Sequence, residues 1–301
     1  MSASASARAD VREGGRWTLG QRVKNEAIFF VAAAALHGTR LVPRAALRFA
    51  GRGLGRLLHV LLRGERNRAL ANVARALPAL DERERTPLVA RTSVELGGTV
   101  GETAAALWHV PDTLPFSAAD QRILREALAD GRGVVLPSAH LGPWERVAST
   151  LVAFGFPLTT LVRESYDHRF DRWMERLRGR AGVATIPRGG PGAAAKILRT
   201  LRRGGVLASV MDLRSRVPSV EVPFFGVTAS TAIGPARIAL RTEAPVVVAT
   251  AERRGGELAL TCTRLALGAD AKTLTAAINA ELARRIATAP ELWPWMHPRF
   301  T

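Results

Sequence analysis

The segment SAHLGPWERV, residues 138–147, carries a histidine and a glutamate five positions apart, His140 and Glu145. A neutral imidazole can take a proton from a hydroxyl near neutral pH, and a carboxylate that accepts a hydrogen bond from one ring nitrogen leaves the other free as the base. Pro143 suits the first turn of a helix, which places Glu145 near the positive end of the helix dipole. We therefore expect an ionised Glu145 to pair with His140, and His140 to act as a general base.

Two elements must position this motif. The apolar run at residues 133–137 predicts a buried strand, and residues 144–154 have helical spacing. His140 then falls in the turn at the carboxyl end of a strand, where ligands gather in open α/β sheets. This setting favours a catalytic histidine over a histidine that only stabilises a turn.

Short apolar runs alternate with helical windows from residue 111 onward. The runs occupy residues 134–136, 158–162, 183–186, 206–211, 246–250 and 258–262. The helical windows occupy residues 119–129, 144–154, 168–178, 193–203, 232–241 and 271–287. Such alternation predicts an α/β fold with a mainly parallel central sheet flanked by helices.

The N-terminal third of the chain predicts helices and no strand. Residues 1–20 are rich in Ser, Ala, Gly and Arg without apolar periodicity, which indicates a mobile tail. The apolar stretch at residues 27–36 is too short for the roughly twenty residues that a spanning helix needs, and residues 41–50 mix arginines with apolar positions as interfacial helices do. We expect an N-terminal helical region at 21–110 with an interfacial membrane helix, followed by an α/β domain at 111–301. An ordinary packing helix is the alternative.

The charge of the chain predicts anionic partners. Lys and Arg number 43 against 26 Asp and Glu, for a net charge of +17. The sequence lacks zinc-ligand spacing, interleaved aromatic residues and a basic helix of the kind that reads DNA. We therefore do not expect nucleic acid as a partner. The basic residues are spread among apolar ones, so we expect an anionic membrane surface as the partner.

The sequence predicts no metal and no cofactor. His168 and His297 have no companions at ligand spacing, and neither a Rossmann glycine fingerprint nor a P-loop occurs. Cys262 is the only cysteine and lies in an apolar run, which indicates a buried structural thiol.

Several segments from about Arg40 onward together resemble the bacterial lipid A late acyltransferases, also called lauroyl/myristoyl acyltransferases. These share an H-x4-E/D motif with the glycerolphosphate acyltransferases. HLGPWE resembles the catalytic motif of that family, and VPFFG at residues 222–226 resembles the segment after its acceptor-site aspartate. The order and spacing of other segments also match: RNRALANVARALP ending at Pro78, Glu102, GPARIALRTEAPVV from Gly234, and WPWMHPRF near the C-terminus.

The resemblance implies an acyltransferase of lipid A and lipopolysaccharide biosynthesis. It implies transfer of a fatty acyl group from an acyl carrier protein or coenzyme A thioester to a hydroxyl or hydroxyacyl group of a phosphorylated membrane glycolipid, with a lipid A precursor as the first candidate. His140 would be the general base and Glu145 its partner. The protein would work at the cytoplasmic face of the inner membrane, as a peripheral or monotopic protein.

The same resemblance implies five substrate-binding residues: Arg163, Arg176, Asp212, Phe224 and Phe225. Arg176 and Asp212 stand where the family has a further functional arginine and aspartate, and the two phenylalanines would guide acyl chains. Taken by themselves, Arg176 also fits a solvated helix charge, and the phenylalanines also fit ordinary core positions.

Two departures from the family pattern bear on the acceptor. Pro143 stands where the family usually has Asn, and Leu213 stands where it usually has Gln. Loop residues beside a base determine what can approach it. Phosphatidylinositol mannosides and lysophospholipids are therefore alternative acceptors, and a catalytically silent protein that binds anionic lipid is an alternative of another class.

Overall fold

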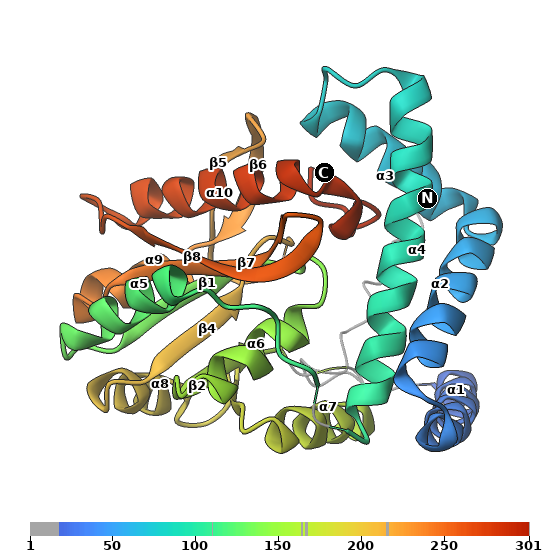
Figure 1. Ribbon diagram of the computed structural model, residues 1–301, viewed down its shortest axis with the longest axis horizontal. Coiled ribbons are helices and arrows are strands. Elements are labelled where there is room, and N and C mark those ends of the chain that lie inside the picture. Colours follow the sequence, from blue (N-terminus) through green and yellow to red (C-terminus); the bar gives the residue numbers. More distant parts are fainter. Residues whose placement is uncertain (1–17, 110, 164, 166–167, 215–216, 301) are drawn as a thin grey trace, which may run out of the picture.

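The computed structural model describes residues 18–109, 111–163, 165, 168–214 and 217–300 (Figure 1). The expected mobile tail falls mostly on residues 1–17, which lie outside the described residues. Helix α1 begins at Leu19, inside the range assigned to that tail.

A six-stranded sheet forms the centre of the molecule, in the order β3-β2-β4-β1-β7-β8. Its strands are β1 Val134–Ser138, β2 Leu158–Val162, β3 Ala184–Pro187, β4 Val206–Val210, β7 Val246–Arg254 and β8 Glu257–Leu265. All neighbouring pairs are parallel except β7 with β8, which is antiparallel. The predicted α/β fold with a mainly parallel sheet is confirmed.

Helices cover both faces of this sheet. They are α5 Ala118–Ala129, α6 Trp144–Ala153, α7 His168–Arg180, α8 Ala193–Arg202, α9 Gly234–Thr242 and α10 Ala271–Thr288. Val134 and Leu136 of β1 share a core with α5 and α6, whereas Val135 lies in the core that contains α9 and α10. Side chains that alternate along β1 thus build two cores, as expected for a sheet between two helical layers.

The connections after β1 and β4 pass to opposite faces of the sheet. The chain leaves β1 through α6 on one face and reaches β7 from β4 through α9 on the other. The carboxyl ends of these adjacent strands therefore bound the crevice in which open α/β sheets place their ligands.

One antiparallel hairpin was not predicted. Strands β5 Ser219–Phe224 and β6 Val227–Ala232 pair only with each other. Their burial alternates or is partial, and Ser, Thr and Glu occupy many positions, so they lack the continuous apolar run that indicated the other strands.

The N-terminal helices stand beside the sheet (Figure 1). They are α1 Leu19–Gly38, α2 Arg44–Leu61, α3 Arg63–Ala76 and α4 Glu82–Ala106, with a short 3-10 turn at Thr39–Leu41. None of the helices in the described part of the chain has both the length and the apolar character needed to span a bilayer.

Glycines allow α2 and α4 to pack backbone against backbone. A Cβ on Gly55 would overlap the carbonyl oxygen of Ser93, and a Cβ on Gly51 would overlap that of Gly97. The close approach fixes the position of α2, because only residues without a side chain fit at this crossing.

The C-terminal segment joins the N-terminal helices to the sheet domain. A 3-10 turn at Pro290–Leu292 leads to Trp293 and Trp295, which are fully buried in one core with Val73 of α3. The side-chain amide of Asn72 donates to the carbonyl oxygens of Trp295 and His297, at 2.8 Å in each case.

Candidate active site

His140 lies in the turn between β1 and α6, at the carboxyl end of the central strand. Gly142 makes the turn with a φ of +59°, a value that favours glycine, and its amide donates to the carbonyl oxygen of Leu292 at 3.0 Å. The imidazole is about one quarter exposed and contacts the ring of Trp144 edge to face, with 5.2 Å between centroids.

Asp212 follows β4, the parallel neighbour of β1, so its carboxylate meets His140 at the same edge of the sheet. One carboxylate oxygen lies 2.9 Å from Nδ1 of His140. The other accepts from the backbone amide of His140 at 2.9 Å and from Nε1 of Trp293 at 2.7 Å. The carboxylate is fully buried, and these donors compensate its lost hydration.

The two groups stabilise each other's charged forms. Burial opposes protonation of His140, but the charge of Asp212 and the hydrogen bond to it raise the pKa of the imidazole above its usual value. Burial likewise opposes ionisation of Asp212, yet the charge of His140 and the hydrogen bonds from His140 and Trp293 hold the pKa of the carboxyl below its usual value. An ionised carboxylate only accepts, so Nδ1 carries a proton and Nε2 is left as the basic nitrogen.

Glu145 makes a different contact from the one expected. Both of its oxygens accept from the guanidinium of Arg178 on α7, at 2.6 Å from Nη2 and 3.2 Å from Nε. The pair is nearly buried, with 8% of the Glu145 side chain and 19% of the Arg178 side chain exposed. The hydrogen bond to the imidazole in this structure comes from Asp212, whereas the charge of Glu145 contributes to the raised pKa of His140.

The two predicted arginines lie in different settings. Arg163 follows β2 and lines the cavity beside His140. Arg176 is exposed on α7 and is not among the residues that line this cavity, which instead include Arg178 two positions further along.

The two predicted phenylalanines lie behind the site, in the core. Phe224 is fully buried, 5.8 Å from the ring of Trp293, and Phe225 packs 5.7 Å from Trp295. Neither lines the two cavities that reach His140. Phe224 thus supports the tryptophan that donates to Asp212, whereas Phe225 contacts Trp295, which in turn packs against Trp293.

A cationic cavity of about 540 Å³ opens beside His140, between α7 and the ends of β2, β3 and β4. Its charged walls are five arginines and two carboxylates: Arg163, Arg172, Arg178, Arg188, Arg214, Asp171 and Glu175. Arg188 donates to Ser209 Oγ and to the Val210 carbonyl oxygen, both at 3.2 Å. Guanidinium groups in this number suit a ligand that carries phosphate.

A second, apolar slot of about 90 Å³ runs from His140 between the sheet and α6. Its walls are mainly aliphatic side chains: Leu136, Val147, Ala148, Leu151, Leu158 and Ala208. Trp144, Glu145 and Arg178 also line it, so the imidazole borders both an apolar and a cationic space.

The family model described as bacterial lipid A biosynthesis acyltransferase matches residues 19–301. The chain belongs to this family. The family resemblance inferred from the motifs is therefore confirmed.

Curated relatives of this chain carry two kinds of name. Phosphatidylinositol mannoside acyltransferase of Mycobacterium tuberculosis (strain ATCC 25618 / H37Rv) is 30% identical over 189 residues, which are 59% of this chain and 57% of the relative. The protein of the same name from Mycolicibacterium smegmatis is 30% identical over 187 residues, covering 59% of this chain and 60% of the relative. Lipid A biosynthesis palmitoleoyltransferase of Escherichia coli (strain K12) is 24% identical over 269 residues, 86% of each chain. The match thus spans less than two thirds of the mycobacterial relatives.

Sequence reasoning did not assign several residues of this candidate site. Arg178 and Arg188 have no motif of their own, and Trp293 opens the WPWMHPRF segment that matched the family without being given a role. Tertiary contacts bring all three to His140. His297 also lines the cationic cavity, where burial holds the pKa of its imidazole below the usual value. The described residues contain no cluster of three or more His, Cys, Asp or Glu that could hold a metal ion.

Proposed function

We propose that this acyltransferase moves a fatty acyl group from an acyl carrier protein or coenzyme A thioester to a hydroxyl or hydroxyacyl group of a phosphorylated membrane glycolipid. The observation that carries the proposal is the His140–Asp212 pair, with Nδ1 bound to a buried carboxylate at the point where a cationic and an apolar cavity meet. His140 is the general base, and Asp212 orients it.

In the proposed reaction, Nε2 of His140 takes the proton of the acceptor hydroxyl as its oxygen attacks the thioester carbonyl carbon. The tetrahedral intermediate collapses, the carbon–sulfur bond breaks, and the imidazolium returns the proton to the leaving thiolate. The products are the acylated lipid and the free thiol. General-base assistance of this kind contributes about 10²–10⁴-fold, and Asp212 stabilises the imidazolium while it exists.

Arg178 is the side chain that we assign to the negative charge on the thioester oxygen. It lines both cavities that reach His140, and the bidentate contact with Glu145 fixes the plane of its guanidinium. In this mechanism Glu145 of the H-x4-E motif acts through Arg178, while the partner of the base is Asp212.

The two cavities suit the two parts of the substrates. The aliphatic walls of the slot suit the methylene groups of an acyl chain nearest the thioester, and the cationic cavity suits the phosphate of an acceptor, with Arg163 on its wall. A lipid A precursor is the first candidate acceptor. A phosphatidylinositol mannoside is the second, supported by the 30% identity to the mycobacterial enzymes of that name.

The proposed location is the cytoplasmic face of the inner membrane, as a peripheral or monotopic protein. Apolar side chains such as Phe30 of α1 and Phe49 of α2 are exposed by 65% and 76%, on a chain with a net charge of +17. Exposed apolar groups among arginines are typical of helices at an anionic membrane surface.

The test is acyl transfer by the purified, detergent-solubilised protein, followed by mass spectrometry. Thioesters of acyl carrier protein and of coenzyme A, with several chain lengths, are offered against lipid A precursors, phosphatidylinositol mannosides and lysophospholipids. We expect a product that gains one acyl group and that the His140→Ala variant does not form. A folded, lipid-bound protein that transfers nothing would instead indicate a catalytically silent lipid-binding protein.

A further inference from the structure

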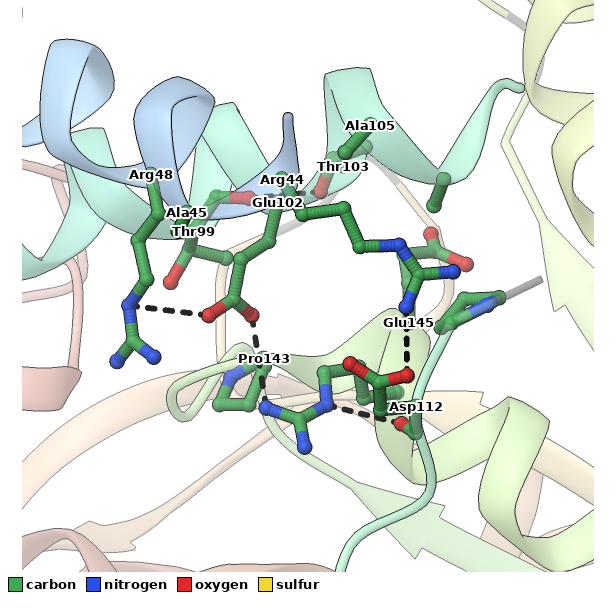
Figure 2. A pocket seen from close by; sticks show the side chains of 13 residues that line it. Arg44, Ala45, Arg48, Thr99, Glu102, Thr103, Ala105, Asp112, Pro143 and Glu145 are labelled. Carbon is green, nitrogen blue, oxygen red and sulfur yellow. Dashed lines mark hydrogen bonds and ion pairs between the residues drawn. The ribbon is translucent and has the colours of Figure 1, made fainter. Parts of the chain in front are cut away.

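A third cavity, of about 440 Å³, lies where α2 and α4 face the start of α6 (Figure 2). It does not include His140 among its walls. Glu145 is the residue that it shares with the aliphatic slot, so the two spaces lie on either side of this side chain.

The charges around this cavity balance. Arg44 contacts Asp112 at 2.6 Å, and Arg48 contacts Glu102 at 3.1 Å. Arg146 lies 3.8 Å from Glu102. Figure 2 shows Arg48 beside Glu102 and Arg44 beside Asp112. The walls themselves hold three arginines and three carboxylates, Glu145 among them, whereas five arginines and two carboxylates line the cationic cavity beside His140. A neutral ligand suits these walls better than a phosphate does.

The uncharged walls combine methyl and ring groups with hydrogen-bond acceptors. Ala45, Ala105 and Pro143 supply apolar surface, and Thr103 adds a hydroxyl. Oε2 of Glu102 is buried and accepts no hydrogen bond within the described part of the chain, which is unusual for a carboxylate oxygen. A ligand with an amide N–H or a hydroxyl next to methyl groups would satisfy it.

We propose that this cavity, the α2–α4 cavity, binds the pantetheine arm of the acyl donor. The inference rests on the proposed acyl transfer. Pantetheine is a neutral chain that carries amides, a hydroxyl and geminal methyl groups, and it is common to coenzyme A and acyl carrier protein. With the acyl chain in the aliphatic slot, the arm passes Glu145 into the α2–α4 cavity, and its phosphate meets Arg44 and Arg48, whose side chains are 34% and 41% exposed at the rim.

The first test measures the steady-state kinetics of a variant in which a larger side chain fills the α2–α4 cavity. Ala45 is exposed on α2 and lines the α2–α4 cavity, and the next residue, Ala46, is exposed but does not line it. We expect Ala45→Trp to raise the KM for both acyl-coenzyme A and acyl carrier protein thioesters by about tenfold or more, with the KM for the lipid acceptor unchanged. Ala46→Trp should match the wild type. A donor KM that does not change, or one that changes for the coenzyme A thioester alone, would overturn the assignment.

Thiol labelling tests the same assignment without catalysis. Burial, together with the nearby charge of Asp120, raises the pKa of Cys262 to about 12, so this thiol stays unreactive in the folded protein. Desulfo-coenzyme A has no thiol, and we expect it to slow maleimide labelling of the Ala45→Cys variant at least fivefold. Labelling of the Ala46→Cys variant should not change. Adenosine 3′,5′-bisphosphate, which lacks the pantetheine arm, should protect neither variant. Equal labelling rates with and without desulfo-coenzyme A would contradict the proposal. Failure of the proposed reaction would appear separately, as a wild-type protein that transfers no acyl group.

Discussion

At the level of single residues, the imidazole of His140 contacts one carboxylate and lies near a second. Asp212 binds Nδ1, and Glu145 binds Arg178. The carboxylate of the H-x4-E motif and the carboxylate that binds the imidazole are thus different groups in this structure. Substitutions at the two positions should have different kinetic signatures.

Asp212→Asn should lower kcat by about 10²–10⁴-fold, because an amide neither stabilises the imidazolium nor fixes the tautomer in the same way. The base works only when neutral, so activity falls as the pH drops through the pKa of His140, which Asp212 raises. Without that charge, burial lowers this pKa, and the acidic limb of the pH profile of kcat/KM should move to lower pH. If the acidic limb of the pH profile did not move in Asp212→Asn, Asp212 would not determine the pKa of His140.

Glu145→Gln should act mainly on the position of Arg178. Loss of a charge-assisted contact costs about 1.5–3 kcal/mol, which corresponds to a drop in kcat/KM of about 10–150-fold. The acidic limb should move less than in Asp212→Asn, since the charge of Glu145 affects the pKa of His140 less than that of Asp212 does. Arg178→Lys should lower kcat/KM to a similar extent, because the ammonium of lysine cannot make the two parallel hydrogen bonds that a guanidinium makes to a carboxylate. Normal activity in both variants would remove this pair from the mechanism.

The sequence identified His140 and Glu145 through their local spacing and Asp212 through family resemblance. The contact between His140 and Asp212 could not be read from the sequence, because it depends on β1 and β4 being neighbours across 72 positions. Arg178 was missed in favour of Arg176 for a related reason. Two positions along a helix turn a side chain by roughly 200°, and the sequence did not reveal which face of α7 points to the site.

At the level of elements, apolar runs predicted the six strands of the main sheet and missed the hairpin β5–β6. Pro78 lies in the gap between α3 and α4, where Asp81 caps α4 through a reciprocal hydrogen-bond pair with Glu84. The crossing of α2 and α4 was not predicted, because glycines in a helix indicate close packing only once the partner helix is known.

The crossing of α2 and α4 predicts that one added methyl group destabilises the protein at some glycines of α2 and not at others. Gly55→Ala should lower the free energy of unfolding by about 1–3 kcal/mol, because the new Cβ overlaps the carbonyl oxygen of Ser93. Gly53→Ala is the matched control, since a Cβ at Gly53 meets no atom within 4 Å. That change should stabilise the protein by up to about 1 kcal/mol through helix propensity. Urea unfolding measures both, and equal effects would contradict the backbone contact.

At the level of the whole molecule, the excess of arginine and the exposed apolar residues of α1 and α2 predict salt-dependent membrane binding. Cosedimentation with vesicles that contain anionic lipid should fall as the salt concentration rises, because salt screens the attraction of arginines to the lipid. Phe49→Ser should weaken binding roughly tenfold at every salt concentration by removing an exposed aromatic group. The neighbouring Ala50→Ser change serves as the control. Equal binding by both variants would place the contact surface elsewhere.

The contact of Trp293 with Asp212 has a consequence for protein synthesis. Asp212 and Trp293 are 81 positions apart, so at about 5–20 residues per second the ribosome adds the tryptophan about 4–16 s after the aspartate. During that interval β1, β4 and His140 are already made, but the carboxylate lacks one of its donors. The nascent chain therefore carries His140, the proposed base, well before the tryptophan that completes the hydrogen bonds of Asp212. We expect acyl transfer to begin only after Trp293 has been translated.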